Sequence, residues 1–110
     1  MQYSHYQCNM AAMLQLGKWF DYLREQDVYD NTRIILVADH GRNLEHFDEL
    51  LMDDGSGSVE DVEFYYPLLM VKDFNSQGFT TSDEFMTNAD VPTLATQNLI
   101  KEPRNPFTGK

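Results

Sequence analysis

The spacing of apolar residues along the chain predicts two elements in its first 40 residues. Near the start, apolar side chains recur at three- and four-residue steps, at Met10, Met13, Leu16, Phe20 and Leu23. This spacing predicts an amphipathic helix over residues 4–26. Residues 34–38, IILVA, are apolar without alternation, which is typical of a strand covered on both faces in a parallel sheet. The preceding Asp30-Asn31 supplies turn chemistry.

The middle of the chain predicts weaker elements. Residues 42–52 have loose helical spacing, and residues 53–61, DDGSGSVED, are acidic and rich in Gly and Ser. The second segment therefore predicts a mobile loop. A second apolar run predicts a strand over Pro67–Val71, with the proline at its start because proline cannot donate a ladder hydrogen bond.

The last third predicts one more helix, within residues 87–100. Asn88 or Asp90 can cap it, and Pro92 suits its first turn, where the missing amide costs nothing. The order helix, strand, short helix, strand, helix describes part of a doubly wound α/β sheet. We therefore expect residues 1–110 to form a partial α/β domain, the C-terminal portion of a larger one.

Composition and charge exclude several functions. Hydrophobic residues make up 42% of the 110 residues, and the 7 Phe, 6 Tyr and 1 Trp add to a content sufficient for a packed core. With 8 basic and 18 acidic residues, the net charge of −10 disfavours binding to nucleic acid. The single Cys8 excludes an internal disulfide, and we interpret it as a structural thiol rather than a nucleophile. No apolar run approaches the ~20 residues of a membrane span, so the sequence predicts a soluble chain.

The best candidates for chemistry follow the first predicted strand. Asp39 and His40 come where residues 34–38 end, and ligands bind beyond the carboxyl ends of strands in open α/β sheets. A carboxylate and an imidazole together suit a divalent ion such as zinc or manganese. Gly41 lets the chain bend so that both side chains can converge. An Asp-His at a strand end is also common as a plain structural turn. His46 is close enough in sequence to face the same crevice, or to be a surface or capping residue.

Three blocks of sequence, in order, resemble the sulfatase and alkaline phosphatase superfamily. YDNTRIILVADHG at 29–41 is similar to the family's strand ending in a metal-binding Asp-His-Gly. YYPLLMV at 65–71 resembles a later "V-P-L-I-I" strand, and TNADVPTLAT at 87–96 resembles a "D-x-x-P-T-L" helix start. NPFTGK at 105–110 resembles the approach to a final strand. The likeness is to the branch with phosphoethanolamine transferases and lipoteichoic acid synthase-type phosphoglycerol transferases.

This resemblance implies an alkaline-phosphatase-like fold and a parent that is a metal-dependent hydrolase or transferase of phosphate or sulfate esters. It implies that Asp39 and His40 bind zinc, manganese or calcium. The other ligands and the nucleophile come from the family's N-terminal half, and no C-x-P-x-R motif occurs here. We therefore assign no catalytic residue to the fragment and expect it to be inactive alone.

The neighbouring residues refine the expected reaction. Arg42 stands where the family usually has Glu, and with His46 it is a candidate for the vicinity of substrate or metal. No lysine lies between Lys18 and Lys72, although sulfatases usually carry one there to contact sulfate. This favours a phosphoryl-group transferase over a sulfatase.

The resemblance also implies partners and a location. The substrate would be a phosphate- or sulfate-bearing glycan or lipid, and the parent would be extracytoplasmic and possibly membrane-anchored, with its N-terminal half completing the domain. The alternative is a non-catalytic α/β module that binds a partner or self-associates. Exposed sheet edges would favour a homodimer in that case.

Overall fold

The computed structural model describes residues 2–42, 48–53, 55–57, 59–105, 107 and 109. Their contacts divide the chain into two compact units, residues 1–33 with 73–78, and residues 34–72 with 79–110. Within the described residues the structure is mixed α/β, with helices and two small two-stranded antiparallel sheets.

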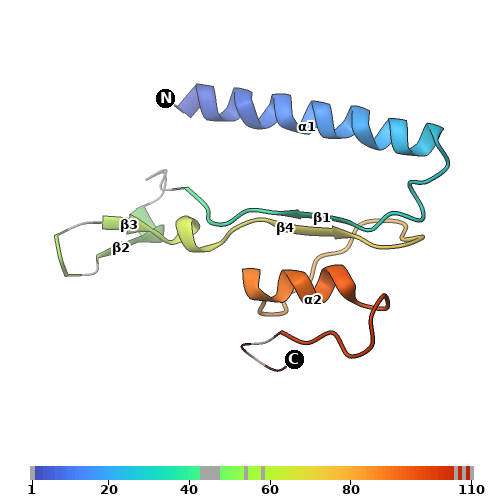
Figure 1. The fold of residues 1–110 in the computed structure, drawn as a ribbon. Helices are drawn as coiled ribbons and strands as arrows, with labels where there is room; N and C mark the ends of the chain where they lie inside the picture. Colours follow the sequence, from blue (N-terminus) through green and yellow to red (C-terminus); the bar gives the residue numbers. More distant parts are fainter. Residues whose placement is uncertain are drawn as a thin grey trace. The chain divides into compact units, whose positions relative to one another are not determined.

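The first unit is built on helix α1, Gln2–Glu25 (Figure 1). The apolar spacing predicted it, and its bounds lie within two residues of the prediction. The helix ends in a Schellman motif, in which the amide of Val28 bonds the carbonyl of Leu23 at 3.0 Å and that of Asp27 bonds Arg24 at 3.0 Å. Asp27 adopts the left-handed conformation that this motif requires, with φ of 57°.

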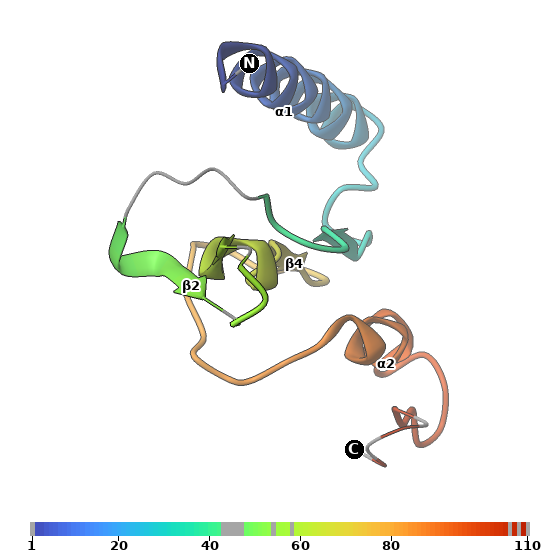
Figure 2. The same cartoon turned by 90° about the vertical axis from the view of Figure 1, so that its left-hand side faces the viewer.

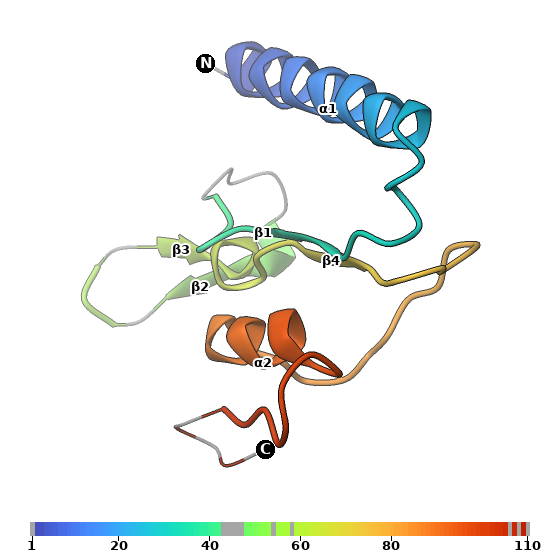
Figure 3. The same ribbon diagram turned by 45° about the vertical axis from the view of Figure 1, so that its right-hand side comes forward.

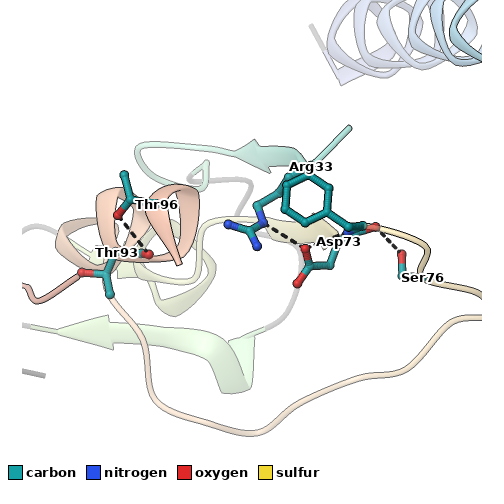
Figure 4. A network of polar contacts seen from close by, with 6 residues as sticks. Arg33, Asp73, Ser76, Thr93 and Thr96 are labelled. Atoms are coloured by element: carbon teal, nitrogen blue, oxygen red, sulfur yellow. Dashed lines mark hydrogen bonds and ion pairs between the residues drawn. The ribbon is translucent and has the colours of Figure 1, made fainter. Parts of the chain in front are cut away.

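After α1 the chain is tied to residues 73–78 by polar contacts. Nε of Arg33 donates to Oδ1 of Asp73 at 2.9 Å (Figure 4). The guanidinium also lies over the ring of Phe74, 4.6 Å from its centroid, and its side chain is only 6% exposed. The amide of Asn75 donates to the carbonyl of Asp30 at 2.8 Å. The Asp30-Asn31 turn predicted from the sequence is present.

The second unit is organised around two paired strands, β1 (Ile34–Val37) and β4 (Leu69–Lys72), which run side by side in Figure 1. They are antiparallel, and Ile34 lies opposite Lys72. Both strands were predicted, but the parallel neighbour expected for the first was not found among the described residues. The apolar run reflects a strand that is half-buried rather than covered on both faces.

The segment predicted as a mobile loop, residues 53–61, has strand residues at both ends and belongs to a hairpin. Strands β2 (Leu51–Asp53) and β3 (Val59–Asp61) pair antiparallel, flanked by the 3-10 turns η1 (Asp48–Leu50) and η2 (Val62–Tyr65). Gly55, Ser56 and Gly57 lie between the two strands. These residue types are typical of loops, so the composition predicted a loop and not the strands on either side of it. Of the helix expected at 42–52, only the η1 turn is described, and residues 43–47 lie outside the described residues.

The C-terminal part of the second unit is a short helix followed by a folded tail. The 3-10 turn η3 (Asn88–Asp90) leads into α2 (Val91–Thr96), beside the β1–β4 pair (Figure 3). Pro92 is in the first turn as predicted, but the helix stops well before residue 100. Figure 2 shows the irregular segment, residues 79–87, that leads to η3 and α2, and the segment that follows α2 toward the C-terminus.

No apolar side chain is fully buried among the described residues, contrary to the packed core expected from composition. The only fully buried side chains there are polar, those of Asp61 and Asn105. Two-stranded sheets and one short helix cannot enclose an apolar interior, so the strand residues stay partly exposed. No helix in the described part of the chain combines the length and apolar character needed to cross a membrane.

The Arg33–Asp73 contact predicts a measurable contribution to stability. Asp73→Ala removes the carboxylate from a nearly buried guanidinium, so we expect a loss of about 1–2 kcal/mol in the free energy of unfolding. Thermal unfolding followed by circular dichroism measures this.

A surface pair supplies the control. Arg24 and Asp21 also bond at 2.9 Å, but both side chains are at least half exposed. Asp21→Ala should change stability by less than about 0.5 kcal/mol. Equal effects of the two substitutions would contradict the role given to Asp73.

Candidate metal centre

The Asp39–His40 turn lies where the pairing of β1 with β4 is interrupted. Beyond the strands, the amide of Ala38 donates to the carbonyl of Leu68 at 2.9 Å, and the amide of Gly41 donates to the carbonyl of Phe64 at 2.7 Å. Between these two bonds, the two residues 39–40 after β1 face the three residues 65–67 before β4. Pro67 is among those three and has no N–H to continue the ladder. The two side chains therefore project from a turn that is anchored on both sides.

His40 is held with one ring nitrogen engaged. Its Nδ1 lies 2.6 Å from the carbonyl oxygen of Gly41. A carbonyl oxygen only accepts, so this contact requires a proton on Nδ1, and in a neutral ring Nε2 would then hold the lone pair. The ring also stacks on Phe64, with centroids 4.6 Å apart and planes at 24°. A histidine that ligates a metal usually donates its other ring N–H in this way.

The Asp39 carboxylate lies close to Nε2 of His40. Its Oδ1 accepts from the backbone amide of His40 at 3.0 Å, and its Oδ2 lies 3.7 Å from Nε2. The Asp39 side chain is 88% exposed and that of His40 is 56% exposed. Oδ2 of Asp39 and Nε2 of His40 thus lie near each other on an exposed surface, and a proton on Nε2 or a cation bound by both would stabilise the pair.

The donor set fits a divalent ion. Carboxylate oxygen and imidazole nitrogen bind zinc at about 2.0–2.2 Å, so two such atoms 3.7 Å apart are close enough to share one ion. No group of three or more His, Cys, Asp or Glu residues that could hold a metal occurs among the described residues. Arg42 is exposed two residues after His40. His46, the other candidate from the sequence, lies outside the described residues.

Asn88 contacts the turn and was not identified as a site residue from the sequence, where it was only a possible helix cap. Its Nδ2 donates to the carbonyls of Ala38 and Asp39, at 3.3 and 3.0 Å. Beside these contacts lies a shallow hollow of about 390 Å³, lined by Val37, Ala38, Asp39, Asn88, Val91 and Pro92. A contact across 49 residues leaves no local pattern that could have revealed it.

Comparison with protein-family models, curated proteins and solved structures finds no match to this chain.

The close approach of Gly41 to η2 predicts that no larger residue fits there. A Cβ on Gly41 would collide with the carbonyl oxygen of Glu63 and lie 3.2 Å from Cα of Phe64. We expect Gly41→Ala to break the Gly41–Phe64 hydrogen bond and to cost about 1–3 kcal/mol in the free energy of unfolding. Urea unfolding of the two proteins gives the difference.

Gly17 is the matched control, because a Cβ there meets no atom within 4 Å. It lies inside α1, where Gly→Ala should stabilise by about 0.5–1 kcal/mol. If Gly41→Ala were as well tolerated as Gly17→Ala, the close packing of the turn on η2 would be wrong.

Proposed function

We propose that this chain is the C-terminal part of a metal-dependent enzyme of the sulfatase and alkaline phosphatase type, in which Asp39 and His40 are two of the metal ligands. Transfer of a phosphoryl-linked group is favoured over sulfate-ester hydrolysis, because the lysine that sulfatases usually carry is missing between Lys18 and Lys72. The chain itself is expected to be inactive on such esters, with the nucleophile and the remaining ligands supplied by an N-terminal half.

The convergence of Oδ2 of Asp39 and Nε2 of His40, 3.7 Å apart, is the observation that carries the proposal. An oxygen and a nitrogen at this separation, both on exposed side chains, are accessible to one ion. The bond from Nδ1 to Gly41 supports the same assignment, because it orients the ring.

A second support comes from the three blocks that resemble the family. The block at 29–41 contains β1, the block at 65–71 contains most of β4, and these strands pair with each other. The block at 87–96 contains Asn88, which bonds the backbone of Asp39. Blocks far apart in the sequence thus meet around the proposed ligands.

The residues divide the work as follows. When bound, the ion would activate a hydroxyl nucleophile and stabilise charge on a phosphoryl oxygen. Asp39 and His40 would hold it, the Gly41 carbonyl would orient the imidazole, and Arg42 stands close in sequence to attract a phosphate- or sulfate-bearing glycan or lipid. Two ligands fill only half of a tetrahedral site, so binding by this chain alone should be weak.

Metal titration tests the proposal directly. We expect zinc or manganese to bind the chain and to perturb the NMR signals of Asp39 and His40. His40→Ala should weaken zinc binding at this turn at least tenfold, because it removes half of the protein ligands. Isothermal titration calorimetry measures the affinity.

His5→Ala is the matched control, since His5 lies on α1. It should leave the affinity unchanged. Equal binding by the wild-type chain and the His40→Ala variant would refute the metal site.

The alternative is a non-catalytic α/β module that self-associates, and one observation favours it. Val37, Met70 and Val71 on the β1–β4 pair are all more than 40% exposed, and no third strand joins the pair among the described residues. Exposed apolar strands with open edges tend to pair with another chain. The missing half of a larger domain would cover the same surface.

Light scattering after gel filtration distinguishes a monomer of 12.8 kDa from a dimer. If the strand pair mediates association, we expect Val71→Lys to shift the population toward monomer, because charge blocks edge pairing. Phe85→Lys, at a 90% exposed position in an irregular segment, should have no such effect. A wild-type chain that stays monomeric at high concentration would exclude the self-associating module.

A further inference from the structure

We propose that Asn88 is a positioning residue that sets the direction of the Asp39 carboxylate, and that Asp90 and Asn105 hold Asn88 in place. These three residues are called the asparagine relay below. Its consequence for metal binding rests on the proposed function, whereas its effect on the turn does not.

In the first step, Asn88 is bonded to the Asp39–His40 turn through its side-chain amide. An amide nitrogen has two hydrogens, and Nδ2 of Asn88 directs them to the carbonyls of Ala38 and Asp39. These carbonyls belong to the two peptide groups on either side of Asp39. Because the peptide groups are planar, holding both of them restricts the backbone dihedrals of Asp39 and so the direction of its side chain.

The second step is the turn that carries Asn88. The carboxylate of Asp90 folds back onto Thr87, where Oδ2 accepts from the amide at 2.8 Å and from Oγ1 at 3.2 Å. The amide of Asp90 donates to the carbonyl of Thr87 at 2.9 Å. Asp90 occupies the N-cap position of α2, one of the two candidates from the sequence, but its side chain makes no capping bond there and instead closes the η3 turn around Asn88.

The third step is the anchor of Asp90. Nδ2 of Asn105 donates to Oδ1 of Asp90 at 2.6 Å, and Asn105 is fully buried. Its Oδ1 accepts from the amide of Phe107 at 2.8 Å, so both ends of the buried amide are bonded. An amide buried and satisfied in this way is costly to move. Asn105 therefore bonds the C-terminal segment to η3.

The relay predicts that removing Asn88 loosens the turn without unfolding the protein, because Asn88 is exposed. In the metal-free chain, Asn88→Ala should speed hydrogen exchange of the Gly41 amide about fivefold, the factor expected for loss of one neutral hydrogen bond. The Asn75 amide, in the other unit, should keep its exchange rate. Asn9→Ala, at an exposed position of α1, is the control and should change neither amide.

An unchanged Gly41 exchange rate in Asn88→Ala would overturn the relay, whatever the chain does with metal. This measurement separates the relay from the proposed function, since it contains no metal. A chain that binds no zinc would contradict the proposed function alone.

Where zinc binds, a double-mutant cycle tests the order of the relay. Asn88→Ala should weaken zinc affinity about tenfold, the lower range for a residue that orients a ligand. Asn105→Ala should weaken it in the wild-type background and have no further effect when Asn88 is already alanine. Independent, multiplying effects would show that Asn105 does not act through Asn88. If Asn105→Ala does not fold, the exchange rate of Asn88→Ala decides.

Discussion

The antiparallel pairing of β1 with β4 stops opposite Pro67, and the proposed metal ligands lie at this interruption. Pro67 has no N–H, so the ladder that ends with the Ala38–Leu68 bond resumes only at Gly41 and Phe64. Asp39 and His40 occupy the gap. They are exposed because the turn projects, yet they are oriented because the backbone is bonded on both sides of them. Exposure and orientation together distinguish this turn from an ordinary surface loop.

The Asp39–His40 turn belongs to a strongly acidic chain and follows a strand whose apolar side chains are partly exposed. The chain carries a net charge of −10 and places Oδ2 of Asp39 3.7 Å from Nε2 of His40. In such a field a divalent cation relieves repulsion as well as adding bonds. The apolar side chains left exposed on the β1–β4 pair are a surface that a partner or a larger domain would cover. A larger domain that covers these strands would also supply further ligands, so both features are consistent with one proposal.

Local patterns predicted the features that depend on neighbouring residues. The spacing from Met10 to Leu23 predicted α1, the run at 34–38 predicted β1, and its end marked Asp39 and His40 as the candidate site. Pairing between distant segments was not predictable in the same way. The antiparallel partner of β1, the β2–β3 hairpin, and the bonds made by Asn88 and Asn105 depend on contacts across many residues, which leave no periodic signal. Composition did not predict the strand residues at the two ends of 53–61, because the Gly and Ser residues between them are typical of a loop.

The protonation of the His40 ring tests the central claim most directly, because the proposed site requires a proton on Nδ1 and a free Nε2 facing Asp39. Long-range ¹H–¹⁵N correlation spectra of the neutral imidazole identify which nitrogen is protonated. We predict the Nδ1–H form in the metal-free chain, and a large shift of the Nε2 signal when zinc is added. A ring protonated at Nε2, or an Nε2 signal that ignores zinc, would contradict the account.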